Sequence, residues 1–278
     1  MKVFIQSNKY QLLAAKVSKY SFEKFGCEVK IMNLEDNIFL KGNFNKKIRR
    51  NDKIVHFKDD LQSFTLLRFY APELNNFSDK ILIIDPDIFA LKNPKTLFDE
   101  IGDSNYDIAC TFYNNKPRSE MMLVNAKNLN WNFNEIINDL FSLKIDYRDL
   151  MDLNFDKNLR IKNIDKKFNS HDIINSDTVL LHTTNRITQP WKEGLQVNFE
   201  RNNLTSFYFF KQHLKKILNL SYDKNSISKI FQKHPDENVI NFVKKLFIEA
   251  RDSKIISEKE INEEILNNNI SKNFFNLS

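Results

Sequence analysis

The sequence is poor in the residues that mark several common protein classes. It has only four glycines and two cysteines in 278 residues, and no apolar run approaches the roughly eighteen residues that a membrane-spanning helix needs. Neither a P-loop nor a dinucleotide-binding glycine fingerprint is present. Cys27 and Cys110 are too few for a disulfide framework or a cysteine metal cluster, so we expect two small buried thiols.

Strong charge of one sign is also missing. The chain carries 42 basic and 36 acidic side chains, a net charge of +6, and lacks the interleaved aromatic and basic pattern of nucleic-acid binders. We therefore expect no nucleic-acid partner. The densest basic run, residues 45–53, is either a solvated loop or a contact for a phosphate-rich acceptor or an anionic membrane surface.

The beginning of the sequence, MKVFIQSNKY, predicts a strand and turns polar too soon for a signal peptide. We expect a cytoplasmic protein. Peripheral association with the inner face of the membrane is the alternative, because the basic run and a basic amphipathic stripe over residues 207–218 could both meet anionic lipids. The same stripe could instead pack against the rest of the protein.

Apolar periodicity predicts an α/β fold in the first part of the chain. Helical patterns at residues 10–26 and 61–74, the second stopped at Ala71-Pro72, alternate with strand patterns. Such alternation predicts a mixed, mostly parallel central sheet. The predicted strands cover residues 2–7, 27–34, 80–87, 106–113, 121–127 and 177–184.

The pattern changes to helices after about residue 200. Residues 236–254 and 257–266 are both helical in period, and the second segment opens with a capping box from Ser257 to Glu260. We therefore predict a catalytic α/β domain over residues 1–200 and a C-terminal helical subdomain over residues 201–278.

Two carboxylates stand where one apolar strand ends. The stretch KILIIDPDIFALKN, residues 80–93, places Asp85 and Asp87 after four apolar residues, with Pro86 stiffening the turn between them. In open α/β sheets ligands bind beyond the carboxyl ends of the strands. The pair could supply oxygen ligands to Mg²⁺ or Mn²⁺, with a nucleoside diphosphate completing the coordination, or could be a plain polar turn.

A second apolar strand ends on a histidine about a hundred residues later. His182 in TVLLHTTNRITQPWKEG could join the two carboxylates on a borderline ion such as Mn²⁺, or could be a satisfied core histidine. The polar groups behind it, on Arg186, Gln189 and Lys192, suit phosphate oxygens, and Pro190-Trp191 stiffens the segment.

At this point the sequence resembles bacterial glycosyltransferase family 8. The segments that carry the resemblance are residues 3–26, FTLLRFYAPELNNFSDKILIIDPDIFAL, SEMMLVNAKNLNW and LLHTTNRITQPW, spread in order over about residues 1–200. The resemblance implies a GT-A fold with Mn²⁺ or Mg²⁺ bridging the diphosphate of a nucleotide sugar. The closing motif departs from the better-known pattern, with Thr184 and Gln189 in place of a glycine and a lysine.

The resemblance also implies roles for individual residues. Asp85, Asp87 and His182 would be metal ligands, with Asp85 also near the ribose, and Arg68 would reach the donor sugar or diphosphate. The remaining donor-binding candidates are Ser7 and Tyr10 at the nucleobase and Arg186, Gln189, Trp191 and Lys192 at the diphosphate. Asp146 and Asp149 are candidate catalytic carboxylates beside the anomeric carbon, or else solvated helix acids.

The implied function is a metal-dependent hexosyltransferase. It would move a sugar from a nucleoside diphosphate sugar, with UDP as the expected nucleotide, to a hydroxyl acceptor, with retention, in surface glycan or lipopolysaccharide-type synthesis. The acceptor could be a glycan, a lipid-linked glycan or a small molecule. Two alternatives are a non-catalytic sugar-nucleotide or membrane-surface binding protein on the same fold, and a sugar-phosphate nucleotidyltransferase.

Overall fold

The computed structural model describes residues 1–57, 63–102, 105–197 and 228–275. The chain divides into two compact units, Met1–His182 and Thr183–Ser278. The division precedes the predicted boundary at residue 200, which lies in the segment outside the described residues and stays a prediction, as does the amphipathic stripe at 207–218. No helix among the described residues combines the length and the apolar character needed to cross a bilayer.

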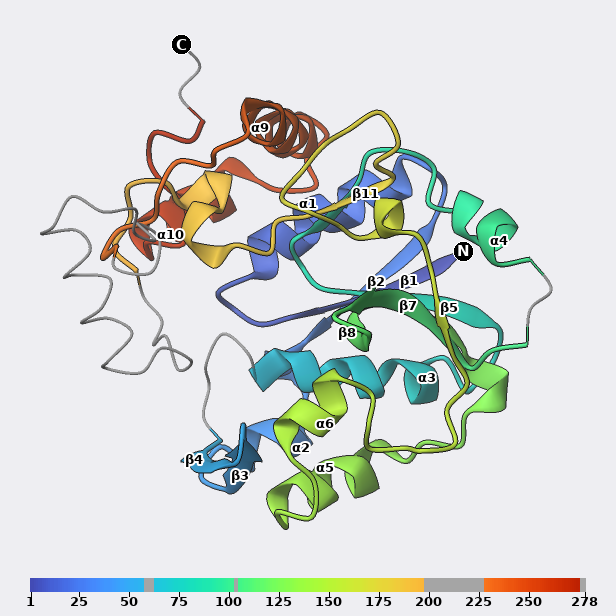
Figure 1. Cartoon of the computed structure of the whole chain (residues 1–278). Coiled ribbons are helices and arrows are strands. Elements are labelled where there is room, and N and C mark those ends of the chain that lie inside the picture. The colour runs from blue at the N-terminus through green and yellow to red at the C-terminus, as the bar shows by residue number, and fades with distance from the viewer. Residues whose placement is uncertain (58–62, 103–104, 198–227, 276–278) are drawn as a thin grey trace, which may run out of the picture. The chain divides into compact units, whose positions relative to one another are not determined.

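The first unit is built on a six-stranded sheet (Figure 1), which confirms the predicted α/β class. The strand order is β2-β1-β5-β8-β7-β9; β1 runs parallel to β2 and to β5, β7 runs parallel to β9, and β8 is antiparallel to both of its neighbours. The sheet is therefore mixed and mostly parallel. Its strands are β1 (Lys2–Ser7), β2 (Glu28–Asn33), β5 (Lys80–Ile84), β7 (Ile108–Tyr113), β8 (Lys116–Asn125) and β9 (Ile161–Asn163).

Both faces of this sheet are covered, as its near-continuous apolar strands require. Val3, Ile5 and Leu82 pack with α1 and α4 on one face, while Phe4 and Ile83 pack into a second core on the other face with α5 and α6. Successive side chains of a strand point to opposite faces, which is why one strand serves two cores. The helices of this unit are α1 (Leu12–Glu23), α2 (Ile38–Lys41), α3 (Ala71–Leu74), α4 (Thr96–Ile101), α5 (Phe133–Phe141) and α6 (Tyr147–Met151).

The predicted helix over residues 61–74 is wrong in its form. The described part is a 3₁₀ helix over Ser63–Phe69 followed by α3, and the stop predicted at Ala71-Pro72 is instead the beginning of α3. Proline is favoured in the first turn of a helix, because the amide hydrogen that it lacks has no intrahelical partner there. The proline therefore begins a helix here.

Two small sheets accompany the large one. β6 (Ile88–Ala90), β10 (Ser170–His171) and β11 (Leu180–His182) form a three-stranded sheet in which β11 pairs antiparallel with β6 and parallel with β10. The strand predicted at 177–184 therefore lies outside the central sheet. β5 itself ends at Ile84, so the last three residues of the strand predicted over residues 80–87 form a turn that leads into β6.

The basic run at 45–53 forms a hairpin and not a loop. β3 (Lys47–Arg50) and β4 (Lys53–His56) pair antiparallel through a turn at Asn51 and Asp52, whose φ angles are 51° and 61°. Paired left-handed residues are typical of a two-residue hairpin turn, and asparagine and aspartate adopt this backbone more readily than most residues.

The second unit is helical where it is described. α9 (Glu237–Asp252) and α10 (Glu258–Leu266) confirm the helices predicted at 236–254 and 257–266. The predicted capping box is present: Ser257 Oγ accepts a hydrogen bond from the Glu260 amide at 3.2 Å, and Glu260 Oε2 accepts one from the Ser257 amide at 2.9 Å. Two short 3₁₀ turns, Arg186–Thr188 and Pro190–Lys192, precede these helices.

Candidate functional site

Asp85 and Asp87 lie in the turn between β5 and β6. The Asp85 amide donates a hydrogen bond to the Glu120 carbonyl at 3.0 Å, and the Ile88 amide donates one to the Asp85 carbonyl at 3.3 Å. Pro86 occupies the position of this tight turn where its fixed φ is favoured. The turn therefore lifts both carboxylates to the carboxyl edge of the sheet, as the sequence predicts.

Strand pairing brings His182 to the same place. Its partner across the β6–β11 ladder is Ile88, the residue after Asp87, and His182 Nε2 lies 3.4 Å from Asp87 Oδ1. The other ring nitrogen, Nδ1, is 2.9 Å from Asn169 Oδ1, while the Asn169 amide donates to Thr111 Oγ1 at 3.0 Å. An amide oxygen on Nδ1 fixes the tautomer that leaves Nε2 available as a metal ligand.

Asp85, Asp87 and His182 form a ligand set that fits a divalent ion. One ligand atom from each of them lies within 4.8 Å of the other two. In the octahedral geometry that Mg²⁺ and Mn²⁺ prefer, neighbouring ligands about 2.1 Å from the ion are about 3.0 Å apart. His182 Nε2 and Asp87 Oδ1 are 3.4 Å apart, close enough for both to reach one ion.

Arg68 holds one side of this ligand set. The residue is 2% exposed, and its guanidinium donates to Asp85 Oδ1 and to Ser119 Oγ, both at 2.6 Å. Ser119 in turn donates to the carbonyl of Met151 at 2.8 Å. Gln6, which is fully buried at the end of β1, also donates to Asp85 Oδ1. Because both donors use Oδ1, the second oxygen of Asp85 remains for an ion.

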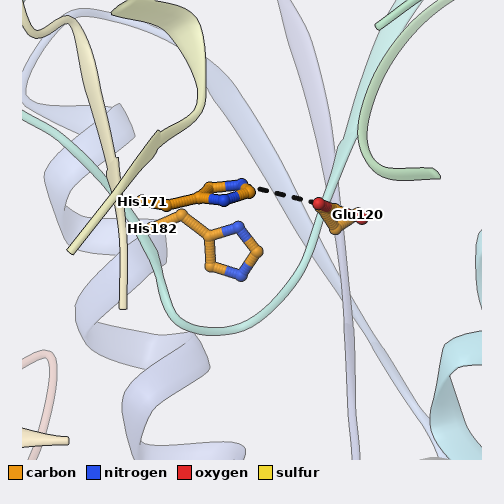
Figure 2. Close-up of side chains that lie close together, drawn as sticks. All are labelled: Glu120, His171 and His182. Atoms are coloured by element: carbon orange, nitrogen blue, oxygen red, sulfur yellow. Dashed lines mark ion pairs between the residues drawn. The ribbon is translucent and has the colours of Figure 1, made fainter. Parts of the chain in front are cut away.

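Two further side chains surround His182. Figure 2 shows the His171 ring beside the His182 ring and directed at Glu120. The ring centroids are 5.4 Å apart at 89°, and His171 Nε2 lies 3.5 Å from Glu120 Oε1. Glu120, His171 and His182 make a second set with ligand atoms within 4.8 Å of one another.

Three groups have shifted pKa values in the cluster formed by Arg68, Asp85, Asp87, Glu120, His171 and His182. Burial raises the pKa of Asp85 to about 6, against the opposing field of Arg68. Burial opposes a charge on His182 too, yet the carboxylates of Asp87, Asp85 and Glu120 prevail and raise its pKa to about 9. For Glu120 burial is outweighed by the contact with His171 and by nearby positive charges, so its pKa lies well below the usual range.

Ser7 lies at the carboxyl edge of the sheet, as predicted, but the structure shows no contact of Tyr10 with the cluster. Ser7 is the last residue of β1, is fully buried, and donates to the Asn8 carbonyl at 3.2 Å. Tyr10 follows in the turn before α1, with Lys9 Nζ 4.9 Å from its ring centroid. Their contacts with a nucleobase stay a prediction.

Asp146 and Asp149 are both engaged in capping. Asp146 begins α6 and accepts hydrogen bonds from the amides of Arg148 at 2.7 Å, Asp52 at 3.0 Å and Asn51 at 3.2 Å. Asp149 Oδ2 accepts the Asp146 amide at 2.9 Å, which completes a capping box. These contacts give both residues a structural role, and the catalytic role stays a prediction.

The remaining donor-binding candidates belong to the second unit. Trp191 stacks on Phe247 with ring centroids 5.7 Å apart, and Lys192 Nζ lies 5.4 Å from the ring centroid of Phe231. Gln189 and Trp191 are 2% exposed and Lys192 is 1% exposed, while Arg186 is half-buried. The first unit ends at His182, so the donor contacts of these residues stay predictions.

Sequence reasoning missed Gln6, Glu120 and His171. Glu120 reaches the cluster because β8 is antiparallel to β5, with Met121 paired to Ile84, so the residue before Met121 lies beside Asp85. His171 arrives through β10, a strand of two residues. An acid directly before a buried-strand pattern, as in SEMMLVNAK, was the available signal for Glu120. No comparable signal marks His171.

Comparison with known proteins finds likeness only among solved structures. No family model and no curated protein matches the sequence. The apo-form glycosyltransferase GlyE of Streptococcus pneumoniae TIGR4 is 15% identical with a TM-score of 0.47, covering 91% of this chain and 64% of its own. The galactosyltransferase LgtC is 11% identical, with a TM-score of 0.43 and coverage of 69% and 89%. The bifunctional glycosyltransferase WbbM has 11% identity, a TM-score of 0.45 and coverage of 69% and 46%.

Proposed function

We propose that this protein is a metal-dependent glycosyltransferase that takes a nucleoside diphosphate sugar as its donor. The observation that carries the proposal is the convergence of Asp85, Asp87 and His182, three ligand atoms within 4.8 Å of one another at the carboxyl edge of an α/β sheet. This edge is where open α/β sheets bind nucleotides. The resemblance of the sequence to glycosyltransferase family 8 points to the same donor class.

The ligand set suits Mn²⁺ or Mg²⁺. Two carboxylates and one imidazole are ligands that Mn²⁺ accepts readily, and the carboxylates alone suit Mg²⁺. When bound, such an ion supplies Lewis-acid stabilisation to a diphosphate leaving group. Three protein ligands leave coordination positions for phosphate oxygens.

The side chains around the ligand set keep it in one geometry. Arg68 and Gln6 fix one oxygen of Asp85, and Asn169 orients the His182 ring. The buried guanidinium of Arg68 also adds positive charge beside the place proposed for the diphosphate, which favours the growing negative charge of the leaving group. Arg68 therefore serves as a positioning residue for Asp85 and as an electrostatic support.

The finer assignments extend the proposal. UDP is the expected nucleotide, with retention as the expected stereochemical outcome and a surface glycan, a lipid-linked glycan or a small molecule as the acceptor. Ser7 and Tyr10 are proposed at the nucleobase, and Arg186, Gln189, Trp191 and Lys192 at the diphosphate. Asp146 and Asp149 stay the candidates that the resemblance offers for the anomeric centre, although their capping contacts favour a structural role.

A donor screen tests the proposal. Purified protein is mixed with Mn²⁺ and a panel of UDP- and GDP-sugars, and nucleoside diphosphate release is measured with and without EDTA. We expect nucleoside diphosphate release from one donor, because the sugar is transferred slowly to water when no acceptor is present. EDTA should abolish this release. Binding of each nucleoside diphosphate is measured in the same samples by calorimetry.

The matched control is Asp79→Asn, which removes an exposed aspartate paired with Lys127 at 3.4 Å outside the ligand set. It should leave release and binding unchanged, while Asp87→Asn should remove both. Absence of both metal-dependent release and metal-dependent nucleotide binding in the wild-type protein would contradict the proposal. Nucleotide binding with no release, even when hydroxyl acceptors are supplied, would instead support a non-catalytic binding protein.

A further inference from the structure

Glu120 and His171 have no part in the function proposed above, although they adjoin its ligand set. Glu120 is 8% exposed; the His171 side chain is 36% exposed, but its Nε2 atom is buried and has no hydrogen-bond partner among the described residues. Figure 2 shows that this ring and the His182 ring lie side by side, with Glu120 opposite His171. A buried nitrogen that meets a carboxylate only as a long ion pair, without a hydrogen bond, needs an explanation.

The spacing of this pair suits an ion better than a hydrogen bond. His171 Nε2 and Glu120 Oε1 are 3.5 Å apart, whereas a good hydrogen bond between such groups spans about 2.7 to 2.9 Å. Two ligands of one tetrahedral zinc ion are separated by about 3.4 Å. His182 contributes a third ligand atom within 4.8 Å of both.

The two ligand sets compete for one nitrogen. His182 Nδ1 is held by Asn169 Oδ1 at 2.9 Å, so Nε2 is the ring nitrogen left to bind an ion. One lone pair binds one ion. An ion held by Glu120 and His171 would therefore remove His182 from the set that contains Asp85 and Asp87.

We propose that Glu120, His171 and His182 form a second metal-binding position that takes Zn²⁺ or a similar nitrogen-preferring ion and excludes the ion held by Asp85, Asp87 and His182. Two imidazoles and one carboxylate are a zinc ligand set with an open fourth position. The other set, with two carboxylates and one imidazole, favours Mn²⁺ by comparison. This inference does not require that the protein transfer sugars.

The positive charge of Arg118 opposes the binding of a metal ion at this second position. Its Nε lies 3.2 Å from Glu120 Oε2 and 3.3 Å from Oε1, and its side chain is 30% exposed. A carboxylate offers about four lone-pair sites, so each oxygen that accepts from Arg118 keeps a second lone pair for a metal. The half-exposed arginine can also turn toward solvent at little cost.

Calorimetric titration of the ion-free protein with ZnCl₂ and with MnCl₂ tests the proposal. His171→Gln should weaken zinc at least tenfold and change manganese less than twofold, because it removes a ring nitrogen from one set only. Glu120→Gln should act in the same direction. Asp87→Asn should do the opposite, weakening manganese at least tenfold with little effect on zinc, and His182→Ala should weaken both.

Controls separate this site from adventitious binding. His56 is an exposed histidine at the end of β4, and His56→Gln should leave zinc affinity unchanged. Far-UV circular dichroism and thermal unfolding of each variant without metal establish that it is folded. In the wild-type protein, zinc K-edge absorption should count two imidazole ligands, which does not depend on any variant.

Several results would overturn the proposal. These are zinc affinity that His171→Gln leaves unchanged, zinc affinity that falls with Asp87→Asn as far as manganese affinity does, one imidazole in the absorption spectrum, or zinc and manganese bound together at full occupancy. Failure of the donor screen with the zinc results intact would refute the proposed function alone.

Discussion

Two closely spaced pairs of aspartates in the first unit have different surroundings. Asp85 and Asp87 lie in a turn at the sheet edge, where their neighbours are His182, Glu120 and Arg68. Asp146 and Asp149 lie at the beginning of α6, where backbone amides occupy their oxygens. A carboxylate whose lone pairs are filled by amides caps a helix, whereas one facing other ligands is available to an ion.

The largest effect that this comparison predicts is on the first pair. Asp87→Asn removes a charged ligand but keeps the side-chain volume, so metal-dependent donor turnover should fall by about a thousandfold or more, since the loss of ion-based charge stabilisation costs several kcal/mol. The measurement is nucleoside diphosphate release at saturating Mn²⁺. Asp149→Asn is the matched change in the second pair. Equal losses in the two variants would erase the distinction between the pairs.

Arg68 should matter next. Arg68→Lys cannot bridge Asp85 Oδ1 and Ser119 Oγ with a planar fork, so the buried carboxylate loses its fixed orientation. We expect turnover to fall by about 10- to 150-fold, because losing a hydrogen bond to a charged group costs about 1.5 to 3 kcal/mol. Manganese affinity measured by calorimetry should fall as well. Arg118→Lys, at a half-exposed pair, is the control; an unaffected Arg68→Lys enzyme would show that Asp85 needs no such support.

The pH dependence of manganese affinity is a further test of the ligand set that contains Asp85 and Asp87. With its pKa raised to about 9, His182 is protonated at neutral pH in the ion-free protein, and the proton competes with the metal for Nε2. Manganese affinity should therefore rise by up to about tenfold per pH unit toward pH 9 and level off above it, with one proton released on binding. Calorimetry in buffers of different ionisation enthalpy counts that proton. A flat profile between pH 7 and 9 would contradict the protonated state of His182.

The smallest effect belongs to the capping pair. Asp146→Ala leaves the amides of Asn51, Asp52 and Arg148 without their acceptor, so the free energy of unfolding should fall by about 1 to 2 kcal/mol. Urea denaturation measures it, and the turnover of the folded fraction should stay within about twofold of wild type. A large loss of turnover with unchanged stability would instead support the catalytic role predicted for this residue.

The sequence predicted the framework of the fold because the spacing of apolar residues can be read within a single segment of the chain. β1, α1, β2, β5 and the helices α9 and α10 follow their patterns closely. The 3₁₀ helix before α3 was not predicted, because the apolar residues of FTLLRF suit an α-helix and a 3₁₀ helix equally well. Packing decides which of the two forms. The hairpin at 45–53 was missed because its turn residues, Asn51 and Asp52, lie in a segment that was interpreted only by its positive charge.

The site was predictable where strand ends could be read and obscure where pairing decides. Asp85, Asp87 and His182 each follow an apolar run, so the sequence alone could place them at an edge. Glu120 and His171 reach the same point only through the antiparallel pairing of β8 and the short strand β10. Register across strands far apart in the sequence is a tertiary property, which no single segment carries.

Titration of UDP into the protein with and without Mn²⁺ tests the central claim most directly. If Asp85, Asp87 and His182 hold an ion that carries the diphosphate, UDP should bind with Mn²⁺, bind at least tenfold more weakly with EDTA, and lose the manganese effect in Asp87→Asn. UDP affinity that is the same with Mn²⁺ and with EDTA, or a manganese effect that survives Asp87→Asn, would contradict the account.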